Sequence, residues 1–118
     1  MSVVVSNPKK EVTIKFPIAE VRKAIKSLPE FATTATLVIS NDTMNYYQFT
    51  AKGEGLFSTG LILEISLHEV SNENTEIRFE GRRAFGWIDN TSEITATYNY
   101  INGCINLTGK VLTGEVKK

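Results

Sequence analysis

The sequence predicts an α+β fold in which one strand and one helix precede a meander of antiparallel strands and a final element. Residues 11–16 alternate between apolar and polar side chains, residues 18–28 repeat apolar side chains with helical spacing, and strand signals dominate from there to residue 84. No repeat, low-complexity tract or linker interrupts the chain. We therefore expect a single domain over residues 1–118, with residues 1–10 as a flexible N-terminal segment.

The first strand and the first helix meet at a proline. In the strand, Val12, Ile14 and Phe16 share one face, as in a half-buried strand. Pro17 ends this strand and suits the first turn of a helix. The helix is expected to close at Pro29, whose ring clashes with the preceding turn. Its apolar side chains form one stripe: Ile18, Val21, Ile25 and Leu28.

Four strands are expected next, separated by turn residues. A β-branched run at residues 36–40 and a turn at 41–43 precede a strand over 46–51. The longest candidate covers residues 57–70, with a bend at Gly60, and the turn at 71–74 leads into the last strand. Alternation places seven side chains of the strands 46–51 and 57–70 on inward faces: Tyr47, Phe49, Ala51, Leu61, Leu63, Ile65 and Leu67.

The final element, residues 91–113, is compatible with a helix and with a hairpin. As a helix it has one stripe of larger side chains: Ile94, Tyr98, Ile101, Ile105, Thr108 and Leu112. Gly114 would end that helix. As a hairpin it would turn at Asn102-Gly103, and its content of Thr, Tyr, Asn and Gly favours this alternative, because these residues are poor helix formers. The local sequence leaves the choice open.

Three stretches resemble the START-like superfamily, also called SRPBCC or helix-grip domains. They are residues 12–28, where a strand passes through Pro17 into an amphipathic helix, residues 57–67 with the bend Ser58-Thr59-Gly60, and the segment Phe85-Gly86-Trp87-Ile88-Asp89-Asn90. The resemblance implies a curved antiparallel sheet of about five strands packed on a C-terminal helix. It therefore favours the helix over 91–113, with Tyr98, Ile101, Ile105 and Leu112 facing inward and Thr95, Asn99, Asn102 and Asn106 facing water.

The same resemblance implies a place for a ligand between the sheet and the C-terminal helix. A small hydrophobic or amphipathic molecule would lie there without being chemically changed. Aromatic and apolar residues suit such a wall, because tyrosine combines an apolar ring with one hydroxyl group. The residues expected to contact the ligand are Tyr47, Phe49, Phe85, Trp87, Tyr98 and Ile101.

Charge and cysteine content restrict the expected partners and location. Thirteen Lys and Arg balance thirteen Asp and Glu, so the net charge is zero, which argues against nucleic-acid or membrane binding. Cys104 is the only cysteine and has no second thiol for a disulfide or a structural zinc site. The N-terminal run of three valines is too short for a signal peptide, and we expect a cytoplasmic protein.

The residue types needed for catalysis are sparse, and we expect neither an enzyme nor a cofactor or metal. His68, the only histidine, falls on an outward strand position. Cys104 has no basic neighbour in sequence to lower its pKa, so a packed, inert thiol is expected. Arg82 and Arg83 lie close to Phe85 and Trp87, a combination that could stack on bases. Without further basic residues nearby, we expect this segment to form a corner or the mouth of the ligand site.

Two functional hypotheses follow. The first is the ligand-binding module described above, and the second is a domain with a solid core that acts through self-association or a protein partner, as a possible homo-oligomer. The shortness of the chain favours the second hypothesis, and the resemblance favours the first. In both, helix stripe and strand faces bury against each other in one core: Val12, Ile14, Phe16, Val21, Ile25, Leu28, Leu63, Ile65, Leu67, Ile77 and Phe79.

Overall fold

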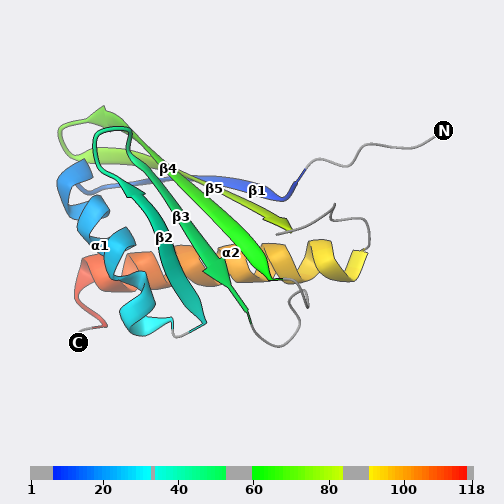
Figure 1. The fold of residues 1–118 in the computed structure, drawn as a ribbon. Coiled ribbons are helices and arrows are strands. Elements are labelled where there is room, and N and C mark those ends of the chain that lie inside the picture. The colour runs from blue at the N-terminus through cyan, green and yellow to red at the C-terminus, as the bar shows by residue number, and fades with distance from the viewer. Residues whose placement is uncertain (1–6, 33, 53–59, 84–90, 117–118) are drawn as a thin grey trace.

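The computed structural model describes residues 7–32, 34–52, 60–83 and 91–116, which form five strands and two helices. The elements in chain order are β1 (Lys9–Ile14), α1 (Ile18–Phe31), β2 (Ala35–Asn41), β3 (Tyr46–Ala51), β4 (Leu61–Ser71), β5 (Asn74–Arg83) and α2 (Thr91–Thr113). The strands form one antiparallel sheet in the order β1-β5-β4-β3-β2 (Figure 1). The predicted α+β class and the predicted order of elements along the chain are confirmed.

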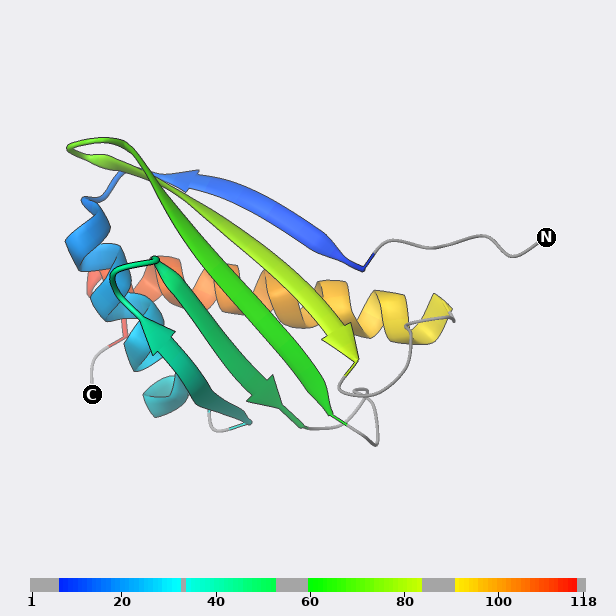
Figure 2. The ribbon, with the colours of Figure 1, turned by 45° about the horizontal axis from the view of Figure 1, so that its top comes forward.

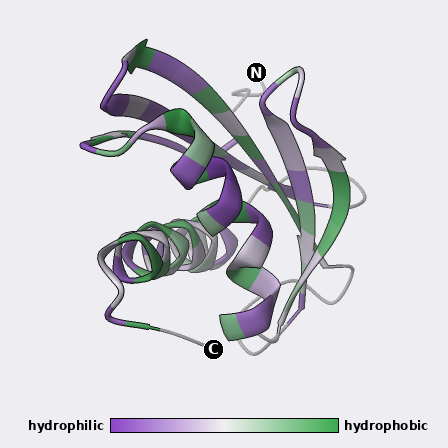
Figure 3. Cartoon of the chain, turned by 90° about the vertical axis from the view of Figure 1, so that its left-hand side faces the viewer, coloured by the Kyte–Doolittle hydropathy of each residue, from purple (hydrophilic) through white to green (hydrophobic). Residues whose placement is uncertain are grey.

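The sheet is curved and twisted, and both helices lie in its concave side. α2 runs along the whole sheet, and α1 lies near the C-terminal end of α2 (Figures 1 and 2). Seen nearly along α2, the sheet arches around the two helices (Figure 3). None of the helices that the structure describes is long and apolar enough to cross a membrane.

The observed element bounds differ from the expected ones at several places, and two of these differences bear on the predictions. β1 begins at Lys9, so it includes the last two residues of the segment that we expected to be flexible. α1 continues through Pro29 to Phe31, and the prediction that Pro29 closes it was wrong. Pro29 removes the bond that its own nitrogen would have donated, but it lies in the last turn, and the helical pattern continues past it because the N–H of Ala32 donates to Leu28 O over 2.8 Å.

The terminal segment is a helix with the predicted bounds, and the hairpin alternative was wrong. Its threonines fit a buried helix face because their hydroxyl groups find partners within the helix. Thr97 Oγ1 donates to the carbonyl of Glu93, and Thr108 Oγ1 donates to that of Cys104, each over 2.7 Å. Tertiary burial thus outweighs the poor helix propensity of these residues.

The inner face of α2 is rotated from the predicted one. Ile101 is fully buried as expected, but Tyr98 is 38% exposed, and Thr97 is buried in its place. The cause lies on β5, where a Cβ added to Gly81 would overlap Thr97 Cγ2. Only a small side chain on the helix fits against this glycine, so Thr97 faces the sheet and Tyr98 turns outward. The prediction that Tyr98 faces inward was therefore wrong.

The core joins α1, α2 and the inner face of the sheet in one apolar cluster. All eleven residues predicted for it belong to it, eight as buried side chains and Val12, Ile14 and Phe16 as partly buried ones. A smaller cluster contains Ala51 and Leu61, with Ile94 and Tyr100 packed against it. The predicted inward faces of these strands are therefore confirmed.

The convex face of the sheet carries charged side chains that pair within β5 and across to neighbouring strands. Arg78 Nε lies 2.8 Å from Glu76 Oε1 and 3.3 Å from Glu11 Oε1. Arg82 Nε lies 3.2 Å from Glu64 Oε1. This is the ordinary structural role expected for the carboxylates of this face.

Candidate functional site

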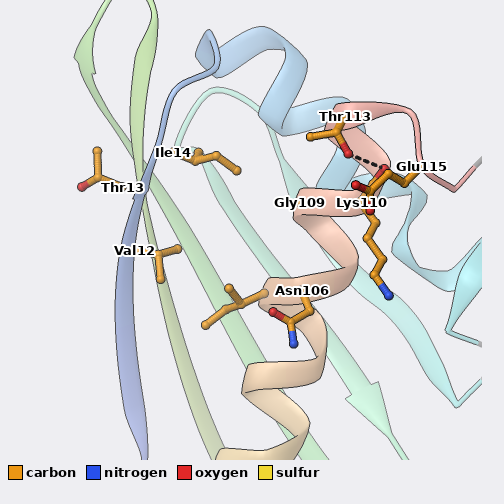
Figure 4. A pocket seen from close by; sticks show the side chains of 9 residues that line it. Val12, Thr13, Ile14, Asn106, Gly109, Lys110, Thr113 and Glu115 are labelled. Carbon is orange, nitrogen blue, oxygen red and sulfur yellow. Dashed lines mark hydrogen bonds between the residues drawn. The ribbon is translucent and has the colours of Figure 1, made fainter.

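A groove of about 460 Å³ lies between β1 and the second half of α2 (Figure 4). Its apolar wall consists of Val12 and Ile14 from the strand and Ile105 from the helix, all partly buried. Thr13 of β1 and polar groups of α2 and of the residues after it complete the lining. The full set of lining residues is Val12, Thr13, Ile14, Ile105, Asn106, Gly109, Lys110, Thr113 and Glu115.

Two periodicities create this groove. The two-residue period of β1 turns Val12 and Ile14 toward the helix. On α2, Gly109 follows Ile105 by four residues and therefore lies on the same face one turn later. Apart from the adjacent backbone of α2 itself, no heavy atom lies within 4 Å of the position that a Cβ on Gly109 would occupy. The missing side chain thus leaves open space beside the apolar wall.

The two ends of the groove differ in polarity. At one end Lys10 Nζ donates to Asn102 Oδ1 over 3.2 Å, which links β1 to α2. At the other end the helix stops at Gly114, whose φ of 80° suits glycine, and the N–H of Glu115 donates to Lys110 O over 2.9 Å. Lys110 and Glu115 place opposite charges at this second end.

Comparison with known proteins identifies the type of fold. No family model matches the sequence, and no curated protein does. Among solved structures, an uncharacterised protein from Bacillus thuringiensis matches with a TM-score of 0.69 at 11% identity, over 92% of this chain and 99% of that one. The protein XoxI from Bacillus cereus matches with a TM-score of 0.65 at 14% identity, over 96% and 100%.

A START superfamily protein from Mycobacterium smegmatis matches with a TM-score of 0.58 at 5% identity, over 95% of this chain and 100% of that one. This chain has the START-like, helix-grip fold. At such low identities the likeness shows the fold alone. The resemblance noted in the sequence is confirmed at that level.

The structure does not bring the six ligand residues expected from the sequence together at one site. Tyr47, Phe49 and Ile101 come together, but as fully buried members of the core cluster. Tyr98 lies on the exposed side of α2, and Phe85 and Trp87 lie outside the described residues. Ligand contact by these six residues stays a prediction.

Sequence reasoning missed the groove, although it assigned some of its residues to the core. Val12, Ile14 and Ile105 were expected to be inward, and they are partly buried. Gly109 was not singled out, because its significance depends on β1 lying opposite. The spacing of Ile105 and Gly109 on one helix face was the available signal.

The histidine and the cysteine lie apart from the groove. His68 is exposed and pairs in register with Glu76 across β4 and β5, as its outward position predicted. Cys104 is buried, and this burial raises the pKa of its thiol to about 12. Among the described residues, no cluster of His, Cys, Asp and Glu could hold a metal ion.

The two neighbouring arginines near the end of β5 point to opposite faces of the sheet. Arg82 pairs with Glu64 on the convex face. Arg83 pairs with Leu61 in the sheet register and its Nε lies 3.5 Å from Glu93 Oε2 in the first turn of α2. The second pair is largely buried and ties the sheet to the helix. These guanidinium groups therefore do not form one basic surface.

Proposed function

We propose that this protein binds a small hydrophobic or amphipathic molecule in the groove between β1 and α2 and does no chemistry on it. The observation that carries the proposal is the space at Gly109 beside the apolar wall of Val12, Ile14 and Ile105. The groove volume of about 460 Å³ lies within the range of roughly 300–1,000 Å³ that is common for small-molecule sites.

The shape and lining of the groove favour an amphipathic ligand. Val12, Ile14 and Ile105 offer a continuous apolar surface, so an apolar ligand body gains free energy by leaving water. The groove is open along one side, and the amide of Asn106 and the hydroxyl of Thr113 lie at its border. A polar part of the ligand would keep its hydrogen bonds there. The START-like fold supports this location, because its sheet and C-terminal helix face each other.

The absence of chemistry is part of the proposal. The thiol of Cys104 is buried in the core, and a pKa of about 12 keeps it protonated near neutral pH. His68 lies exposed near the end of β4, on the convex face. Neither side chain lines the groove. Both observations favour a binding role over a catalytic one.

Two glycine substitutions in α2 test the proposal. In Gly109→Leu a side chain fills the groove, whereas in Gly103→Leu it points into open space on the exposed side. The readout is fluorescence titration with Nile red, a neutral dye that brightens in apolar surroundings. We expect Gly109→Leu to weaken dye binding by roughly tenfold or more and Gly103→Leu to leave it unchanged.

Circular dichroism spectra would verify that both variants keep their helix content. Equal dye binding by wild type and a folded Gly109→Leu would overturn the proposal. Loss of binding in both folded variants would also overturn the proposal, because Gly103 lies outside the groove and its substitution should not affect binding there. Native mass spectrometry of the purified protein would show any ligand that it retains.

A second candidate function is self-association through the edge strand β2. Val38 and Ile39 are 54% and 43% exposed, and β2 contains no charged residue, whereas β1 at the other edge begins with Lys9, Lys10 and Glu11. Charges on an edge strand discourage pairing with another chain, and β2 lacks them. Light scattering should then show a mass above that of one chain, which Ile39→Lys lowers and Thr13→Lys on β1 does not. A single-chain mass at all concentrations would exclude it.

A further inference from the structure

We infer that the ligand of the groove carries an anionic head group and that Lys10 binds it. This inference rests on the proposed function and adds the chemical class of the ligand. The class is an amphipathic oxyanion with one apolar chain or a narrow ring system as its body. The supporting observations are the position of Lys10, its hydrogen-bond partner, and the charges at the two ends of the groove.

Lys10 lies on the same face of β1 as the apolar wall. Side chains two residues apart on a strand share a face, so Lys10 lies on the same face of β1 as Val12 and Ile14, next to the part of the strand that lines the groove. The ammonium group reaches across to α2, where Asn102 Oδ1 accepts its hydrogen bond. Asn102 lies one helical turn before Asn106, which lines the groove. The charge therefore stands at one end of the apolar surface.

The partner of Lys10 distinguishes it from cations on the convex face. Lys9 Nζ lies 3.7 Å from Glu80 Oε1, and Arg82 Nε lies 3.2 Å from Glu64 Oε1. Lys10 has a neutral amide oxygen as its partner, and no carboxylate of the described residues lies within 4.0 Å of its nitrogen. An ammonium group has three donors, so this end offers uncompensated charge and free donors to an oxyanion.

The opposite end of the groove lacks this property. Lys110 lines it together with Glu115, so this end carries one positive and one negative side chain and no net charge. An anionic head group gains more at the Lys10 end, and the apolar body then points toward Lys110. The axial distance from Asn102 to Lys110 is about 12 Å, because eight residues rise by 1.5 Å each. One medium-length chain fits this length, whereas a phospholipid with two chains exceeds the groove.

A matched pair of ligands tests the inference. Decanoate and decan-1-ol share the same apolar chain, but only decanoate carries a charge. Isothermal titration calorimetry should show that wild type binds decanoate more tightly. Lys10→Gln should weaken decanoate binding by roughly fivefold to twentyfold, which is the effect of one partly exposed charge-assisted hydrogen bond, and leave decan-1-ol binding unchanged. Lys9→Gln, one residue away on the convex face, is the control and should behave as wild type.

The outcomes separate this inference from the proposed function. Equal affinity of wild type for decanoate and decan-1-ol would overturn the anionic head group but leave groove binding in place. Binding of neither ligand, with no effect of Gly109→Leu on Nile red, would overturn both. A loss of decanoate preference in Lys110→Gln and not in Lys10→Gln would place the head group at the wrong end and overturn the role of Lys10.

A sedimentation assay distinguishes a free amphipathic acid from a membrane lipid as the source of the oxyanion. Vesicles of phosphatidylglycerol present an anionic head group attached to two chains. We expect the protein to stay in solution beside these vesicles while it binds decanoate. Co-sedimentation with the vesicles, without binding of decanoate, would overturn the inference.

Discussion

The hydroxyl group of the buried Tyr47 donates a hydrogen bond of 2.6 Å to Asp42 Oδ1. The second oxygen of the same carboxylate accepts a hydrogen bond of 2.9 Å from Lys26 Nζ. Asp42 lies in the turn between β2 and β3, and Lys26 lies on α1. One carboxylate thus connects the core side of β3 to the first helix. The hydrogen bond from Tyr47, followed by that from Lys26, lowers the pKa of Asp42 below its ordinary value of 3.8.

Removing the Tyr47 hydroxyl should destabilise the fold in a pH-dependent way. Tyr47→Phe keeps the buried ring, so we expect a loss of about 1 kcal/mol near neutral pH. Because the folded pKa of Asp42 is depressed, its stabilising contribution is present above pH 3.8 and is lost as the pH falls below it. The unfolding free energies of wild type and variant, measured in urea, should therefore converge in acid. A constant difference from pH 7 to pH 2 would contradict this role of Asp42.

The core register provides a second prediction. Leu63 is buried at the centre of the sheet, in contact with the cluster that joins both helices to it. We expect Leu63→Ala to lower the free energy of unfolding by roughly 2–5 kcal/mol through lost burial and the cavity left behind. Met44→Ala is the control, because Met44 is largely exposed and should change stability by less than about 0.5 kcal/mol. Similar effects of the two substitutions in urea unfolding would contradict the register.

The alternation of side chains was sufficient to predict the sheet. Local patterns place Leu63, Ile65 and Phe79 inward because the strand period fixes the face of every second residue. The turns at 41–43 and 71–74 then restrict which strands pair. Neither inference needs a distant contact, and this is why the meander from β2 to β5 was predictable, whereas the pairing of β1 with the distant β5 was not.

The orientation of α2 depends on a contact between residues far apart in sequence. The apolar stripe suggested that Tyr98 faces the sheet, but Gly81 leaves room only for the smaller Thr97. Consecutive residues of a helix differ by about 100° in direction, so burying Thr97 turns Tyr98 toward water. The groove was hidden for the same reason, because Gly109 matters only once Val12 and Ile14 lie opposite.

The buried thiol of Cys104 should be unreactive in the folded protein. Its side chain is 6% exposed, and burial raises its pKa to about 12 from 9.0, so little thiolate exists at pH 8. Ellman's reagent should label the native protein far more slowly than the protein in denaturant. Rapid labelling of native protein would contradict this account of the core.

The same shift predicts a loss of stability in alkali. A raised folded pKa means that the contribution of Cys104 is full below pH 9.0 and decreases as the pH rises toward 12. Cys104→Ala lacks this titration, so its unfolding free energy should fall less between pH 9 and pH 11 than that of wild type. Parallel curves for the two proteins would argue against a buried thiol.

Two glycine-to-alanine substitutions should have opposite effects, because they test the helix and its contact with the sheet separately. Gly103 lies in the interior of α2 with open space around its Cβ position, so Gly103→Ala should stabilise by up to about 1 kcal/mol. Gly81→Ala adds a methyl group that collides with Thr97, and overpacking of this kind costs roughly 1–3 kcal/mol. Both values follow from urea unfolding curves.

A double substitution identifies the cause of the second effect. Thr97→Ser removes Cγ2, the atom that the new methyl group would meet, while it keeps the hydroxyl group that bonds to the Glu93 carbonyl. If the collision is the cause, Gly81→Ala should cost much less in the Thr97→Ser background than in wild type. Equal cost in both backgrounds would show that α2 does not approach β5 at this point. The explanation for the outward position of Tyr98 would then be wrong as well.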